Sequence, residues 1–447
     1  MNQNKLNYIF EAFKQVYDLQ GLPFEVNYGL DECSKVQVRN SGCSFTDMAA
    51  VSPEQVRWQE WRGRKIPFLF SREDCEIISE VDGNVIVNHD ILAAAFYFLS
   101  GMQEYHCTNR DRFGRFRFSD SLQCQLGITV VPVVDYYFDI LRTALERASG
   151  RRLKKRLWSE AAFTTCVTHD IDKCQRGWLE GGLAEARRGH FMTPFQLLYR
   201  KLSGKDVWFN FDEILSILQQ HQARSTFFFL SKKGWQDGVL NADYNIANKG
   251  FAEVLARIRK SGSEVSIHGS FGTHENARRL RQDIHRIDAW VRGNRFHFLA
   301  FDVRKSPAVL EAASLTYDTT LGFSEHYGFR NGTCFPFYLY DIENDRPTGV
   351  LEIPLNLMDT TLHHADYLRV KPWQAVTAAE QVIQEIKKFG GCLTLLWHNT
   401  HFSEYKYPGW RQAFVDILTL CKEEGAEFLT GSEVATRFSP TGTQAPD

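Results

Sequence analysis

The chain has 447 residues, of which 43% are hydrophobic and 13% aromatic, as is typical of an ordinary enzyme-sized globular protein. Its formal net charge of −2 gives no electrostatic footprint for nucleic acid or for a membrane surface. The ten cysteines are scattered without a CxxC pair, which argues against a zinc ribbon or a redox dithiol. We therefore expect a neutral or small-molecule partner and no nucleic acid.

The N-terminal segment, MNQNKLNYIFEAFKQVYDLQ, lacks the uninterrupted apolar run of an export signal. No window of the sequence approaches the ~18 consecutive apolar residues of a membrane span. The sequence therefore predicts a cytoplasmic protein with no membrane span.

Residues 1–150 are predicted to form a small α/β domain, for which the sequence suggests no role. Its predicted elements, in chain order, are a helix near 5–20, a strand at 66–70, a strand pair within 76–87 that turns at Asp82-Gly83, a buried helix at 90–105 and a helix from about Val134 to Arg147. The polar, basic stretch ASGRRLKKR at 148–156 is interpreted as a linker.

From residue 160 to 438 the sequence alternates apolar strands with amphipathic helices, several of which end at glycine. This pattern predicts an α/β fold, a distorted (β/α) barrel of about seven strands. The final segment, 439–447, is predicted to be a disordered tail. The predicted strands lie at 163–169, 225–231, 264–268, 295–301, LTYDTTL, 349–357, 392–398 and EFLTG, and the predicted helices between them include 211–221, 251–260, 275–291, 374–389 and 410–424.

Ionisable residues follow several of these strands. In a parallel barrel the carboxyl ends of the strands meet at one rim, where active sites are assembled, so we expect these side chains to converge. They are His169, Asp170 and Asp172 after the first strand, His268 at the third, Arg295 and His297 on the fourth, Asp318 at the fifth, and His398 and His401 after the seventh.

Asp170 and Asp172 are two apart and can face the barrel mouth together, with His169 turned aside. Two adjacent carboxylates repel, and a divalent cation removes that cost. One aspartate with two histidines suits Zn²⁺ or another first-row metal. Such a cation acidifies water and polarises an amide or ester carbonyl, so Asp170 is expected to take a proton from water and His398 to protonate the leaving group.

The motifs VTHDID, EVSIHGSFGTH, RFHFL, TYDTTLGF with GFRNGTCFPF, and LLWHN, in this order, resemble those of the polysaccharide deacetylase family, the metal-dependent carbohydrate esterases of nodulation-factor-deacetylase type. The resemblance covers roughly 160–438. Residues 1–150 resemble the poorly characterised N-terminal region of some bacterial members. The resemblance implies a distorted barrel, a bound divalent metal, most simply Zn²⁺, and removal of acetyl groups from N-acetylated sugars.

Carried over by position, the family's catalytic base falls on Asp170, the Arg that orients it on Arg295 and the acid on His398. Two metal ligands fall on Asp172 and His268. Here Ile171 separates aspartates that are adjacent in the family, so the roles of Asp170 and Asp172 can be exchanged.

The family's second metal histidine normally follows the first by four residues, whereas His274 follows His268 by six. His274 can therefore be the third ligand only if 269–274 is a loop. For substrate contacts we expect Asp318, Arg330, His401 and Trp397, although Asp318 and Arg330 also suit a pair with each other.

The sequence predicts a hydrolase that removes an acyl group from an N- or O-acylated carbohydrate or a related small amide. Two alternatives stay open. One is a glycoside hydrolase that uses Asp170 or Asp172 with a second carboxylate such as Asp318 or Glu352, without a metal. The other is a non-catalytic protein whose aromatic rim only binds saccharide.

Overall fold

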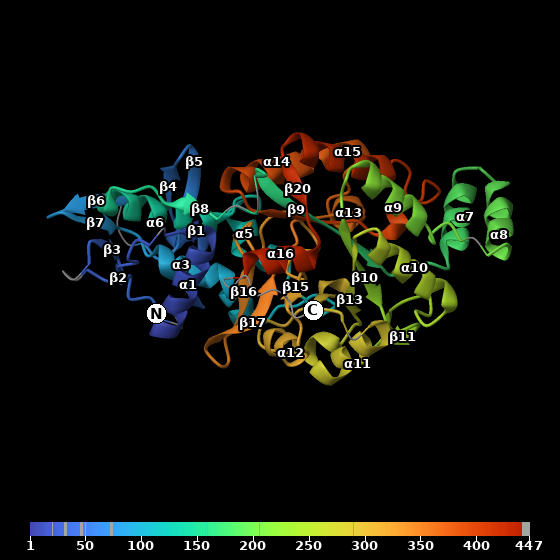
Figure 1. The fold of residues 1–447 in the computed structure, drawn as a ribbon, viewed down its shortest axis with the longest axis horizontal. Coiled ribbons are helices and arrows are strands. Elements are labelled where there is room, and N and C mark those ends of the chain that lie inside the picture. The colour runs from blue at the N-terminus through green and yellow to red at the C-terminus, as the bar shows by residue number, and fades with distance from the viewer. Residues whose placement is uncertain are drawn as a thin grey trace.

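The computed structural model describes residues 1–19, 21–30, 34–44, 48–49, 51–71, 75–156, 158, 160–204, 206–288 and 290–439. The N-terminal part lies at one end of an elongated molecule, and the helical pair α7 and α8 projects from the other end (Figure 1). Apart from Ser439, the predicted tail lies outside the described residues.

The N-terminal part contains small sheets beside three main helices. Its elements are α1 (Gln3–Val16), β1 (Tyr17–Asp18), β2 (Val26–Tyr28), β3 (Val36–Val38), β4 (Arg57–Trp61), β5 (Arg64–Phe68), β6 (Ile78–Val81), β7 (Asn84–Val87), α3 (Ile91–Leu99), α4 (Met102–His106), α5 (Leu122–Gln125), α6 (Val133–Ser149) and β8 (Lys154–Lys155).

The remainder of the chain alternates strands with helices. Its strands are β9 (Phe163–Ile171), β10 (Ser225–Leu230), β11 (Trp235–Gln236), β12 (Val239–Leu240), β13 (Glu264–Gly269), β14 (Gly293–Phe296), β15 (Tyr317–Asp318), β16 (Phe337–Asp341), β17 (Arg346–Glu352), β18 (Leu357–Met358), β19 (Cys392–Leu396) and β20 (Ala426–Phe428). Its helices are α7 (Gly177–Arg187), α8 (Thr193–Leu202), α9 (Phe211–Gln220), α10 (Lys249–Lys260), α11 (Ala277–Ile287), α12 (Ser306–Ala312), α13 (Asp359–His363), α14 (Ala375–Phe389), α15 (Trp410–Glu423) and α16 (Gly431–Phe438).

Ten of these strands form one curled sheet in the order β16-β17-β15-β14-β13-β10-β9-β19-β18, with β20 also paired to β9. All neighbours are parallel except β16 and β17. The sheet therefore has the sequential order of a βα barrel but stays open, since no ladder joins β17 to β18 among the described residues. The prediction of about seven strands misses the antiparallel β16 and the two-residue strands β11 and β12, and it joins β17 and β18 into one strand, 349–357.

The central strand β9 is buried at all nine positions, as expected for a parallel strand with both faces covered. Burial on both faces explains its run of apolar and β-branched residues. It also explains why a charge near its carboxyl end needs a partner, since Asp170 is the second-last residue of this buried strand.

Two predicted elements are interrupted. The expected helix at 90–105 is two helices, because Gly101 takes φ 72°, and a Cβ there would lie 3.0 Å from Val303 Cγ2. The expected strand 295–301 ends at Phe296, because Phe298 and Leu299 have φ of 62° and 55°. His297 therefore begins a tight turn at the end of the strand.

The stretch 148–156, predicted as a linker, pairs with the N-terminal part. Strand β8 within it is antiparallel to β1, and Leu153 is buried. A single cluster of buried apolar side chains includes residues of both parts of the chain. Residues 1–150 therefore pack directly against the barrel sheet.

Candidate metal centre and active site

A cavity of about 410 Å³ opens at the carboxyl ends of the central strands. The barrel strands deliver ionisable side chains to it from four places: Asp170 and Asp172 from β9, His268 from β13, His297 from the turn after β14, and His398 after β19. The N-terminal part also reaches this cavity, through Arg112, Phe113 and Arg115.

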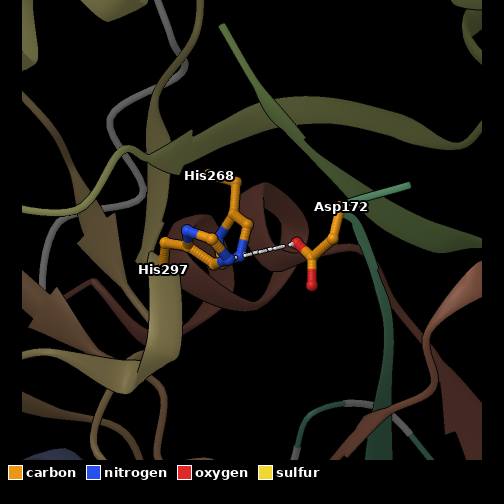
Figure 2. A group of neighbouring side chains, drawn as sticks. All are labelled: Asp172, His268 and His297. Carbon is orange, nitrogen blue, oxygen red and sulfur yellow. Dashed lines mark ion pairs between the residues drawn. The ribbon is translucent and has the colours of Figure 1, made fainter. Parts of the chain in front are cut away.

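Asp172, His268 and His297 converge at the bottom of the site (Figure 2). Oδ1 of Asp172 lies 3.3 Å from Nε2 of His268 and 3.8 Å from Nε2 of His297. One ligand atom from each residue lies within 4.8 Å of the other two. One carboxylate with two imidazoles is a common ligand set for a first-row divalent metal.

The other ring nitrogen of each histidine is already engaged. Nδ1 of His268 donates to the carbonyl oxygen of Arg295 at 2.7 Å, and Nδ1 of His297 lies 3.2 Å from Oδ1 of Asn241. With a proton on Nδ1, each Nε2 presents a lone pair toward Asp172. This is the tautomer that a metal ligand requires.

The cluster fits a cation on electrostatic grounds. Oδ1 of Asp172 is buried and accepts no hydrogen bond from any residue that the structure describes. Although burial opposes its charge, the neighbouring histidines hold the pKa of Asp172 far below its usual range. Burial lowers the pKa of His297 to about 3, so this ring is neutral. Although burial opposes a charge on His268, Asp170 and Asp172 raise its pKa. A cation bound in this cluster would displace the proton of His268, after which both Nε2 atoms offer a lone pair beside the carboxylate.

Asp170 is held differently. Its Oδ1 accepts from Nη1 of Arg295 at 2.9 Å, and both side chains are buried. Arg295 is itself fixed by Thr168 and Thr319 and lies over the ring of Phe228. Oδ2 of Asp170 stays 3.6 Å from Nε2 of His268 and is the oxygen nearer to the cluster. Arg295 thus orients Asp170 through this contact.

On the opposite side of the site, His398 is held by Asp359, which begins α13. Asp359 Oδ1 lies 2.7 Å from Nδ1 of His398, and its Oδ2 accepts from the backbone N–H of the same residue at 2.7 Å. Burial opposes a charge on His398, but Asp359 outweighs it and raises the pKa of His398 to about 10. Nε2 of His398, 3.7 Å from Oδ2 of Asp172, therefore carries a proton into the pocket.

Asp359, His398 and His401 also lie close enough to hold a metal. In this group, however, both histidines direct Nδ1 at Asp359, with His401 at 3.0 Å. The carboxylate also accepts from the backbone N–H groups of Thr360 and His398. Because its oxygens are already saturated with donors, this group suits an aspartate-histidine pair better than a cation site.

His274 does not join the metal cluster, which corrects the prediction that it is the third ligand. After His268 the chain turns at Gly272, with φ 83°, into a short 3-10 turn, Thr273–Glu275. Nε2 of His274 lies 3.9 Å from Glu275, and its ring packs against Phe271 and Phe296. His297, from the next strand, lies where that third ligand was expected.

Three predicted substrate contacts are also corrected, since none of them lines the cavity. Trp397 directly follows β19, and its side chain points into the helix layer. It is fully buried there against Trp410 and Phe414. Asp318 is buried and accepts from Asn294 and Thr320.

Arg330, the third of these residues, pairs with Glu104 of the N-terminal part at 2.7 Å and not with Asp318. Both partners are almost fully buried, so the pair joins the two parts of the chain. His401, the fourth predicted contact, does line the cavity.

Sequence reasoning missed Asp359 and the pocket residues of the N-terminal part. Asp359 follows directly after the predicted strand 349–357 and β18, so the strand-end rule that singled out Asp318 applies to it equally. Arg112, Phe113 and Arg115 carry no comparable signal, because only tertiary packing brings their segment over the barrel mouth.

The profile of one family, described as a family of unknown function (DUF7033), matches residues 2–149. No match was found among the curated proteins. Among solved structures, a protein from Mycobacterium smegmatis assigned as a polysaccharide deacetylase is 16% identical, with 64% of this chain and 95% of that chain covered and a TM-score of 0.40.

A protein assigned the same activity from Pseudomonas aeruginosa PAO1 is 13% identical, with 62% and 91% covered and a TM-score of 0.41. PuuE allantoinase is 12% identical, with 64% and 93% covered and a TM-score of 0.42. At this level of similarity, any functional proposal has to rest on the residues of the site.

In the part of the chain that the structure describes, no helix combines the length and apolar character needed to cross a membrane.

Proposed function

We propose that this protein is a metal-dependent hydrolase that removes an acyl group, acetyl in the simplest case, from an N- or O-acylated carbohydrate. The observation that carries the proposal is the convergence of Asp172, His268 and His297, with one unsatisfied carboxylate oxygen facing two imidazole nitrogens. A divalent cation, most simply Zn²⁺, would be held by these three residues. When bound, it supplies polarisation of the acyl carbonyl and acidification of water.

The chain's own residues supply the proton transfers. Asp170, whose Oδ1 is fixed by Arg295, takes a proton from the attacking water through Oδ2. Water adds to the acyl carbon, and the bond to the sugar nitrogen or oxygen breaks. His398 delivers its Nε2 proton to that leaving atom, and Asp359 stabilises the imidazolium before transfer. The products are a carboxylic acid and a free amine or hydroxyl.

The charge arrangement supports assigning the base to Asp170 and the ligand to Asp172. Asp170 is bound to a buried arginine, which would repel a cation at the same oxygen. Asp172 has histidines beside it, and no arginine of the described residues forms an ion pair with it. The exchange of roles that the sequence leaves open is therefore disfavoured.

The glycoside hydrolase alternative needs a second carboxylate in the pocket beside Asp170 or Asp172, such as Asp318 or Glu352. Asp318 and Glu352, the residues considered for that role, are both fully buried and do not line the cavity. The carboxylates that do line it, Asp170 and Asp172, both lie within 3.6 Å of Nε2 of His268. This geometry supports a cation site over an acid-nucleophile pair.

The proposal is tested by acetate release from acetylated chito-oligosaccharides. The purified chain is stripped with a chelator and assayed before and after zinc is restored. We expect activity to disappear on stripping and to return with zinc. Saccharide binding that is unaffected by the chelator, with no acetate released, would instead support a non-catalytic binding protein.

A further inference from the structure

The helical hairpin α7–α8 exposes an unusual amount of apolar surface. Seven large hydrophobic side chains between residues 183 and 202 are more than a third exposed. They are Leu183 (52%), Phe191 (70%), Met192 (70%), Phe195 (67%), Leu198 (37%), Tyr199 (75%) and Leu202 (78%). Contiguous exposed apolar surface of this kind marks an interaction site.

On α8 the exposed residues Phe195, Leu198, Tyr199 and Leu202 have the spacing i, i+3, i+4 and i+7, which is one face of a helix. The opposite side holds Leu197, the one buried residue of α8. An amphipathic helix normally buries its apolar stripe, but here the stripe is exposed. The helix that carries it, α8, lies at the far end of the molecule from the N-terminal part (Figure 1).

The hairpin is anchored to the protein, so the exposed stripe has a fixed position. A Cβ on Gly182 would lie 3.3 Å from Cα of Pro194, so the two helices touch closely. Asp206 caps the N-terminus of α7 and also accepts from the backbone N–H of Trp208, which lines the active-site cavity. Arg188 donates to the carbonyl oxygen of Tyr405 at 2.7 Å. The base of the hairpin is thus held beside Trp208, which lines the cavity.

Basic residues accompany the apolar ones. Between residues 177 and 204 the sequence has Arg187, Arg188, Arg200 and Lys201 against two glutamates. Both glutamates pair with basic residues of the same chain. Glu180 pairs with Lys173 and Lys406, and Glu185 pairs with Arg188 and His190. Arg187 and Arg200 are exposed beside the stripe.

We propose that the α7–α8 hairpin docks this protein onto an anionic lipid bilayer surface. An exposed apolar stripe flanked by arginine and lysine is the pattern of helices that lie in the membrane interface. The overall charge of −2 gave no indication of this, because acidic residues elsewhere offset the basic ones here. A second protein copy fits less well, since a stable interface needs roughly 20–30 residues a side.

The inference is independent of the proposed chemistry, and so is its test. The full chain is co-sedimented with vesicles of phosphatidylcholine, with or without phosphatidylglycerol. We expect binding to the anionic vesicles, weaker binding to the neutral ones, and a decrease in binding as salt rises.

The paired variant Phe195→Ser with Tyr199→Ser should weaken binding about tenfold or more, because each aromatic loses apolar burial. Its matched control is Trp290→Ser with Trp373→Ser, two residues 74% exposed outside the hairpin, which should bind as the parent does. Phe195→Leu with Tyr199→Leu should retain binding. Equal melting temperatures verify the fold of each variant.

Arg187→Gln with Arg200→Gln should weaken binding to anionic vesicles by about fivefold per charge, with Arg278→Gln and Arg281→Gln as the charge-matched control. No binding of the parent chain to anionic vesicles would overturn the inference. So would equal binding by the serine pair, or a dimer that the serine pair dissociates, since that result would assign the stripe to a second copy.

Discussion

Two sets of ionisable residues in the barrel part of the chain differ in how many of their polar atoms have partners. Asp318 and Arg330 are buried with complete sets of partners: Asn294 and Thr320 for the first, Glu104 and Gly322 for the second. Asp172, His268 and His297 instead leave a carboxylate oxygen and two ring nitrogens facing one another. Asp318 ends β15 and Asp172 directly follows β9, so a strand-end position alone does not identify a site, and the unsatisfied oxygen of Asp172 distinguishes the candidate site.

The largest effect is expected from removing a proposed metal ligand. His268→Ala should lower acetate release at least about a hundredfold, because loss of even an outer partner of a ligand commonly costs 10–100-fold. Zinc affinity, measured by isothermal titration, should fall with it. His274→Ala is the matched control, because His274 lies outside the cluster and should keep both properties. Loss of zinc in His274→Ala with retention in His268→Ala would reverse the assignment.

The next effect is expected at the acid. Asp359→Asn removes the carboxylate that orients and charges His398, so kcat should fall about a hundredfold, within the usual range for general acid catalysis. Because Asp359 faces away from the proposed cation, the zinc content and KM should change little. A variant that loses its zinc instead would show that Asp359, His398 and His401 hold the metal.

A smaller effect is expected at the pocket wall supplied by the N-terminal part. Arg112 is exposed and lines the cavity, whereas Arg115 is buried and paired with Asp111. Arg112→Ala should raise KM up to about fivefold, the value of one exposed charged contact, and leave kcat unchanged. Steady-state kinetics with oligosaccharides of increasing length checks this. If Arg112→Ala and the parent chain have equal KM values at every oligosaccharide length, Arg112 does not contact the substrate.

The smallest effect on activity is expected for Glu352, a fully buried carboxylate beside Asp318. Burial raises the pKa of Glu352 well above its usual range, and Glu352 hydrogen bonds to Asp318. The free energy of unfolding is therefore highest at pH values below the pKa of glutamate in the unfolded chain, about 4.3, where Glu352 is protonated in both states. It decreases as the pH rises from there to the raised pKa of Glu352 in the folded protein. Glu352→Gln should therefore keep its activity and show less loss of stability between about pH 5 and 8.

Urea unfolding of Glu352→Gln and the parent chain at several pH values measures that difference. Parallel curves would mean that Glu352 is not protonated in the folded protein. Loss of activity with an intact fold would restore Glu352 as a catalytic carboxylate and favour the glycoside hydrolase alternative.

The sequence predicts much of the barrel because its strands are apolar runs between amphipathic helices that end at glycine. It also predicts Asp170, Asp172, His268 and His398 as neighbours, because each follows a strand. The sequence places His297 only on a strand, since its turn depends on positive φ at Phe298 and Leu299, which no residue type signals. Packing by helices distant in sequence decides which strand-end side chain points into the helix layer, as Trp397 does, and not into the cavity.

The contact between the N-terminal part and the barrel could not be predicted either. Arg330 and Glu104 are 226 residues apart in sequence, and nothing local marks them as partners. The same holds for the segment with Arg112 and Phe113, whose place over the cavity is set by packing of the whole N-terminal part.

The proposed function requires that one cation binds between Asp172, His268 and His297. Anomalous scattering at the zinc edge, from crystals of the full chain grown with zinc, locates that cation. We expect one strong peak within coordination distance of one Asp172 oxygen and both Nε2 atoms. A peak beside Asp359 and His401 instead, or no peak at this cluster in a zinc-loaded crystal, would contradict it.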